Sequence, residues 1–135
     1  MPSFSSTSRE KLATADPRLQ SVFNEVIRYF DCVILCGIRS RAEQDAAVKA
    51  GNSKTPYPES KHNPDPSKAV DAGPFDRKET PIDWMDRERM TYFAGHVIAT
   101  ARSMGIKLRW GGDWDQDTRV KDNSFDDLVH FELVD

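Results

Sequence analysis

The sequence predicts an α+β fold, a small antiparallel sheet with flanking helices, on three observations. Some stretches place apolar residues at helical spacing, several short runs are apolar and rich in β-branched residues, and the two kinds do not alternate in a regular βαβ rhythm. A length of 135 residues predicts one domain over residues 1–135. The polar start, residues 1–8, is expected to be flexible.

The first clear helix is predicted after Asp16-Pro17, because aspartate is a good N-cap and proline fits the first helical position. Its apolar stripe consists of Leu19, Val22, Phe23, Val26, Ile27 and Phe30. The apolar run 32–36 then predicts a buried strand. Its two cysteines, Cys32 and Cys36, are best interpreted as free thiols, with a redox or zinc-binding pair as the alternative.

A second helix is predicted to begin after Ser40, which forms a capping box with Glu43. Arg39 therefore lies where a strand leads into a helix N-terminus. The stretch 52–68 contains four prolines and predicts a loop that carries His62. A short strand is expected to follow it.

The second half of the chain predicts a long helix over 84–104 and two strands, 107–110 and 128–134. A Gly-Gly turn and a polar loop over 113–126 separate these strands.

Composition excludes several classes of protein. A formal net charge of −3 argues against a nucleic-acid partner, which would require a basic face. No apolar segment follows a basic start, so no secretory signal is predicted, and no window approaches the length of a membrane span. We expect a protein that is made in a cytoplasm and does not insert into a membrane.

Two of the three histidines lie in motifs that suit a catalytic zinc ion. His62, Asp71 and His130 offer two imidazoles and a carboxylate, and Asp127 is a spare carboxylate beside them. A catalytic zinc site needs three such ligands, an open position for water and a nearby base. Each motif alone has a plainer interpretation, such as a hydrogen-bonded core histidine or an aspartate that caps a turn.

The alternation of side chains along the last strand predicts which of its residues can face a metal ion. His130 and Glu132 share one face, and the apolar Val129 and Phe131 share the other, so His130 should face a cleft. Asp127 is an odd number of positions from His130, so strict alternation would place it on the opposite face. It can reach the metal only from the turn that enters the strand.

In combination, the motifs resemble the zinc D-alanyl-D-alanine metallopeptidases, whose fold the hedgehog signalling domain shares. The motifs are Gly37-Ile38-Arg39-Ser40 with Gln44, Ser60-x-His62, Ala69-x-Asp71 and Asp127-x-x-His130. The stretch 106–114 is most similar to phage endolysins that cleave the L-alanyl-D-glutamate bond of peptidoglycan. The resemblance covers roughly residues 8–134.

This resemblance implies a role for each matching residue. Zn²⁺ would bind His62, Asp71 and His130, Asp127 would be the general base, and Arg39 would stabilise the scissile carbonyl. Ser60 and Gln44 would line the site. Trp110 is a candidate for the wall of a substrate groove, with a place in the core as the equal alternative.

The chain departs from the family pattern between the first two ligands. His62 and Asp71 are nine positions apart where the family has seven, and the usual glycine is missing. We interpret residues 63–67 as a two-residue loop insertion that leaves Asp71 as the ligand. Asp65 is the rival, but it lies between two prolines and outside the Ala-x-Asp motif.

The sequence therefore predicts a zinc peptidase of bacterial peptidoglycan stem peptides, most similar to a phage endolysin. A monomer is expected, held in the host cytoplasm until the membrane is permeabilised. A D,D-carboxypeptidase is the alternative within the same class. A non-catalytic, zinc-stabilised cell-wall-binding module is the alternative from another class.

Overall fold

The fold is an α+β arrangement, as predicted, in a computed structural model that describes residues 2–121 and 125–135. Its elements are α1 (Ser6–Leu12), α2 (Pro17–Val26), β1 (Cys32–Cys36), α3 (Arg41–Lys49), β2 (Ala69–Pro74), α4 (Arg87–Ser103), β3 (Leu108–Gly111) and β4 (Asp127–Leu133). The four strands found in the described part of the chain form one antiparallel sheet, in the order β1-β2-β4-β3.

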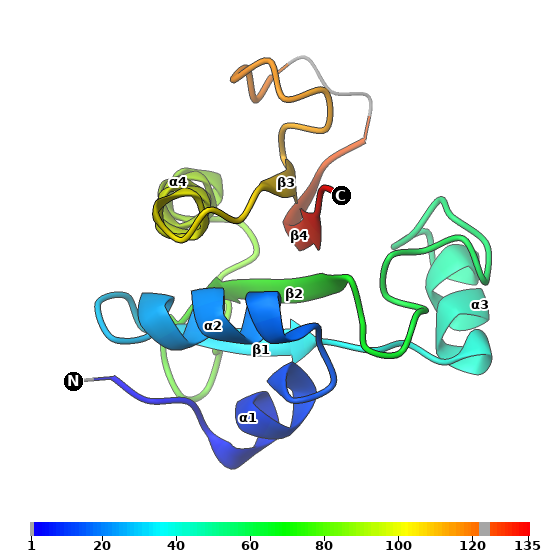
Figure 1. Cartoon of the computed structure of the whole chain (residues 1–135), viewed down its shortest axis with the longest axis horizontal. Coiled ribbons are helices and arrows are strands. Elements are labelled where there is room, and N and C mark those ends of the chain that lie inside the picture. The colour runs from blue at the N-terminus through cyan, green and yellow to red at the C-terminus, as the bar shows by residue number, and fades with distance from the viewer. Residues whose placement is uncertain (1, 122–124) are drawn as a thin grey trace.

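The core lies where α2 and α4 pack against the sheet, and α3 stands to one side (Figure 1). All residues of the stripe predicted for α2 are buried there except Phe30, which is partly buried, and Phe131 of β4 is fully buried in the same core. The Phe131 ring meets Phe23 of α2 edge-on at 5.8 Å and Phe93 of α4 at 6.1 Å. This packing fixes the face that β4 turns to the core, and hence the opposite face that carries His130.

The N-terminal segment is not the flexible tail that its polar composition predicted. Phe4 is buried in the core, and Ser5 caps α1 by accepting a hydrogen bond from the amide of Ser8. Ser8 in turn accepts one from the amide of Ile34 in β1. The prediction for residues 1–8 is therefore wrong from Phe4 onward, because one aromatic side chain and two hydroxyl groups attach the segment. Met1 lies outside the described residues.

The longest helix begins later than predicted. Residues 84–86 precede α4, and Asp86 caps it by accepting from the amide of Arg89. Trp84 and Met85 stay exposed. Of the polar loop predicted over 113–126, residues 122–124 lie outside the described residues, and residues 113–121 and 125–126 hold no helix or strand.

No helix in the described ranges is long and apolar enough to cross a membrane.

Candidate metal centre and active site

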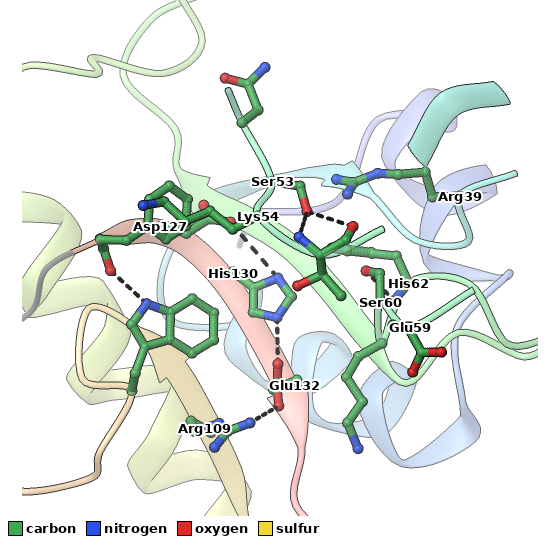
Figure 2. Close-up of a pocket in the computed structure, with 15 residues that line it drawn as sticks. Arg39, Ser53, Lys54, Glu59, Ser60, His62, Arg109, Asp127, His130 and Glu132 are labelled. Carbon is green, nitrogen blue, oxygen red and sulfur yellow. Dashed lines mark hydrogen bonds and ion pairs between the residues drawn. The ribbon is translucent and has the colours of Figure 1, made fainter. Parts of the chain in front are cut away.

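Neighbouring strands bring two of the predicted ligands together. Asp71 of β2 lies directly opposite His130 of β4, and His62 reaches them from the loop before β2. His62 Nε2 lies 3.0 Å from Asp71 Oδ1, and His130 Nδ1 lies 3.2 Å from the same oxygen (Figure 2). All three residues are buried.

In each imidazole one nitrogen, here called inner, faces Asp71, and the other, the outer nitrogen, faces a different oxygen. The contact of the outer nitrogen determines which ring nitrogen carries the hydrogen. His62 Nδ1 lies 2.7 Å from the carbonyl oxygen of Gly37, and His130 Nε2 lies 2.9 Å from Glu132 Oε1. Both oxygens only accept, so each outer nitrogen is an N–H donor. In a neutral imidazole the inner nitrogen then carries no hydrogen and offers a lone pair.

Two lone pairs and a carboxylate oxygen therefore converge on one point, and such a set needs a cation. A divalent metal ion fits, because imidazole nitrogen and carboxylate oxygen are ordinary zinc ligands and each outer nitrogen has an orienting acceptor. Without a metal, protons must take its place. Burial alone would lower the pKa of His62, but the hydrogen bond and charge of Asp71 outweigh it and raise this pKa to about 10.

Two further side chains lie within ligand reach of the centre. A carboxylate oxygen of Asp127 lies within 4.8 Å of the ligand atoms of Asp71 and His130, and Cys36 Sγ lies equally near those of His62 and Asp71. Cys32 and Cys36 are both free thiols, the interpretation that the sequence favoured over a redox or zinc-binding pair.

Asp127 reaches the site because the pairing of β3 with β4 is irregular. Trp110 pairs with Phe131, but the next residue, Gly111, pairs with Asp127. This shift in register interrupts the strict alternation of side chains along β4, as a β-bulge does, so Asp127 can point to the same face as His130. Asp127 Oδ2 lies 4.0 Å from His130 Nδ1, so the aspartate faces the metal centre from the entry of the strand, as required.

Desolvation makes Asp127 a weaker acid than usual. Its burial and the nearby charge of Asp71 raise its pKa to about 6. A carboxyl group in that range can take up and release a proton near neutral pH, which suits a general base.

Arg39 lies beside the metal centre at the start of α3. Its guanidinium donates to Asp71 Oδ2 at 3.4 Å and to Gln44 Oε1 at 3.1 Å. Its backbone amide donates to the carbonyl oxygen of His62 at 2.8 Å, which ties the two site segments together.

Gln44 does not line the site as predicted. It is fully buried beneath Arg39, and its amide nitrogen donates to Ser53 Oγ and to the carbonyl oxygen of Thr55. Its place in the predicted motif thus reflects how it holds Arg39 and the loop, rather than contact with substrate.

The extra residues of the loop 63–67 do not separate the two predicted ligands. Asp71 rather than Asp65 lies beside His62, and Asp65 is exposed. Ser60 lines the cavity and accepts a hydrogen bond from the amide of His62. A spacing of nine positions therefore still brings the two predicted ligands together.

A cavity of about 360 Å³ opens over the metal centre. Its lining includes Arg39, Ser53, Lys54, Ser60, Lys61, His62, Arg109, Trp114, Phe125, Asp127, His130 and Glu132 (Figure 2).

The tryptophan in the cavity wall is Trp114 and not Trp110. Trp110 is buried in the core and donates to the carbonyl oxygen of Leu128. Arg109 pairs with Glu132 on the site face of the sheet, so strand alternation turns the next residue, Trp110, toward the core. The Trp114 ring lies 5.3 Å from the His130 ring.

Sequence reasoning did not predict the hydrogen bond by which Glu132 holds the His130 ring in place. Glu132 accepts from His130 Nε2 and also from Arg109 at 2.7 Å, and it is buried. Burial would raise the pKa of Glu132, but these two hydrogen bonds lower it, so Glu132 stays ionised. The predicted face shared by His130 and Glu132 was the signal that could have revealed this contact.

Comparisons with known proteins identify the family of the chain. A family model described as phage L-alanyl-D-glutamate peptidase matches residues 2–134. The chain belongs to this family. It is 32% identical over 138 residues to the L-alanyl-D-glutamate peptidase of Escherichia phage T5, covering 97% of both proteins. The crystal structure of a Serratia marcescens L-Ala D-Glu endopeptidase matches with a TM-score of 0.76 and 28% identity, over 98% of this chain and 91% of that one.

Proposed function

We propose that this member of the phage peptidase family hydrolyses the L-alanyl-D-glutamate bond of peptidoglycan stem peptides at a zinc centre on His62, Asp71 and His130. Its family and both relatives support the activity. The observation that carries the zinc assignment is the convergence of two imidazole lone pairs on Asp71 Oδ1. Three acceptors facing one point form a cation site.

A zinc ion bound there would polarise the scissile carbonyl and activate a water molecule. Asp127, 4.0 Å from His130, accepts a proton from the attacking water and passes it to the leaving amine of D-glutamate. Arg39 donates to the oxyanion that forms on the L-alanine carbonyl. Glu132 keeps His130 in the tautomer that turns Nδ1 toward the metal.

The two alternatives are less well supported. A D,D-carboxypeptidase would share this centre, but the relatives cut between L-alanine and D-glutamate. A purely structural zinc site in a binding module would need neither Asp127 nor Arg39 beside it. We further propose that the chain acts as a monomer, with peptidoglycan and not nucleic acid as its partner. It would reach the wall from the host cytoplasm after the membrane is permeabilised.

Zinc content and product analysis test this proposal together. Wild-type protein should bind one zinc ion and release peptides with a new N-terminal D-glutamate from purified peptidoglycan, and a chelator should stop the release. His62→Ala, Asp71→Asn and His130→Ala should lose zinc and activity together. Asp65→Asn is the matched control and should keep both, since Asp65 is exposed.

Loss of zinc in Asp65→Asn with retention in Asp71→Asn would reverse the ligand assignment. Zinc-loaded protein that binds peptidoglycan from several Gram-negative bacteria but releases no amines would establish the binding module instead.

A further inference from the structure

The basic side chains of the cavity differ in whether a carboxylate already holds them. Four of them line it: Arg39, Lys54, Lys61 and Arg109. The two arginines are paired with Asp71 and Glu132 respectively. Within residues 2–121 and 125–135, no carboxylate oxygen lies within 4.0 Å of either lysine ammonium. The lysines are thus the cations available to an anionic group of the substrate.

Lys54 reaches the side of the cavity from which Asp127 enters. Its ammonium lies 5.1 Å from the centroid of the Phe125 ring. The carbonyl oxygen of Phe125 accepts from Trp114 at 2.7 Å, and Trp114 packs on His130. Lys54 and Asp127 are both drawn among the side chains that line this cavity (Figure 2). The second lysine, Lys61, directly precedes His62 on the loop before β2.

The substrate must present a carboxylate on the leaving side of the scissile bond. A glutamate residue has two carboxyl groups, and only one of them can continue the stem peptide. The other remains free, a few bonds from the amine that hydrolysis releases. In the proposed mechanism Asp127 passes a proton to that amine, so D-glutamate lies on the Asp127 side of the cavity.

We propose that Lys54 binds the free carboxylate of the D-glutamate residue. The inference rests on the proposed function, because the role of Asp127 sets the direction in which the substrate lies. The contact is a charge-assisted hydrogen bond between ammonium and carboxylate. It makes Lys54 a specificity-determining residue that favours D-glutamate over a residue whose free carboxyl group is a primary amide.

Two stem peptides that differ only in this group test the proposal. One carries the free carboxylate and the other the carboxamide, and kcat and KM are measured with zinc-loaded wild type, Lys54→Gln and Lys61→Gln. Wild type should prefer the acid by about tenfold, the size expected for one hydrogen bond to a charged group. Lys54→Gln should lose the preference through a higher KM for the acid alone. Lys61→Gln, which removes the same charge from the same cavity, should keep it.

Equilibrium binding of both peptides to zinc-loaded Asp127→Ala, with and without Lys54→Gln, gives the same comparison without turnover. The inference is overturned if wild type cleaves and Asp127→Ala binds both peptides alike. It is also overturned if Lys54→Gln weakens both equally, or if the preference disappears in Lys61→Gln instead. Failure of the proposed function shows differently, as no zinc-dependent hydrolysis of either peptide.

Discussion

Two roles compete for Asp127, because the same carboxylate lies within reach of the metal ligands and of an attacking water. If it is the base, Asp127→Asn should keep one zinc ion per chain and lose turnover by about 10²–10⁴-fold. Zinc analysis and peptidoglycan digestion of the same sample measure both. A variant that loses the metal as well would make Asp127 a ligand. Normal turnover would leave the base unassigned, since Glu132 is already held by His130 and Arg109.

Single residues show where sequence reasoning succeeded and where it stopped. His62, Asp71 and His130 were predicted because the chain has few histidines and strand alternation exposes one face of β4. The same alternation, applied to β3, places Trp110 in the core once Arg109 is known to face Glu132. That second fact depends on a cross-strand pair, which no local pattern contains.

At the scale of elements, local chemistry predicted the helix and strand positions well. The capping box of Ser40 and Glu43 forms as expected, and Asp16 caps α2. Helix α1 and the attachment of Phe4 were not predicted, and the burial of Phe4 depends on tertiary contacts. The start of α4 was placed too early although its signal is local, because Asp86 caps the helix by accepting from the amide of Arg89.

The cap of α2 gives a prediction for stability. Asp16 Oδ1 accepts from the amide of Arg18, and Asp16 Oδ2 pairs with Lys68 at 3.1 Å. Asp16→Ala should lower the free energy of unfolding by about 1 kcal/mol at pH 7, as for other N-caps. Asp16→Asn should cost less, because asparagine still caps but carries no charge. Urea unfolding measures all three proteins.

The pH dependence of this contribution has a definite sign. The hydrogen bonds from Arg18 hold the pKa of Asp16 well below its usual value in the folded protein. The charged form therefore stabilises the fold above a pH of about 4, where an unfolded aspartate is ionised. The gap between wild type and Asp16→Asn should shrink as the pH falls below about 4. A gap that stays constant down to pH ~2 would show that the ion pairs contribute nothing.

At the scale of the whole molecule, the sheet order assembles the site. The loop before β2, the start of α3 and strand β4 are distant in sequence. They meet because β1, which leads into α3, and β4 both pair with β2. The order β1-β2-β4-β3 could not be predicted from local patterns, because it depends on which strands pair. The resemblance of the ordered motifs to a known family supplied that information instead.

The buried cluster of His62, Asp71 and His130 should also couple the stability of the whole fold to pH. In metal-free protein, Asp71 raises the pKa of His62 to about 10 despite burial, compared with about 6.5 in an unfolded chain. The folded state then holds a proton that the unfolded state lacks, so this contribution is complete below pH ~6.5 and is lost as the pH rises toward 10. One such proton corresponds to a slope of about 1.4 kcal/mol per pH unit.

Metal-free protein should therefore become less stable from pH 7 to pH 9, as measured by urea unfolding. Zinc-loaded protein should lack this slope, because the metal replaces the proton on His62 and the imidazole is neutral in both states. Metal-free His62→Asn supplies the control and should have a smaller slope than metal-free wild type, since it removes His62 and leaves His130, whose pKa the hydrogen bonds to Asp71 and Glu132 also raise despite burial. Equal slopes for metal-free and zinc-loaded wild type would mean that zinc does not occupy the point where His62, Asp71 and His130 converge.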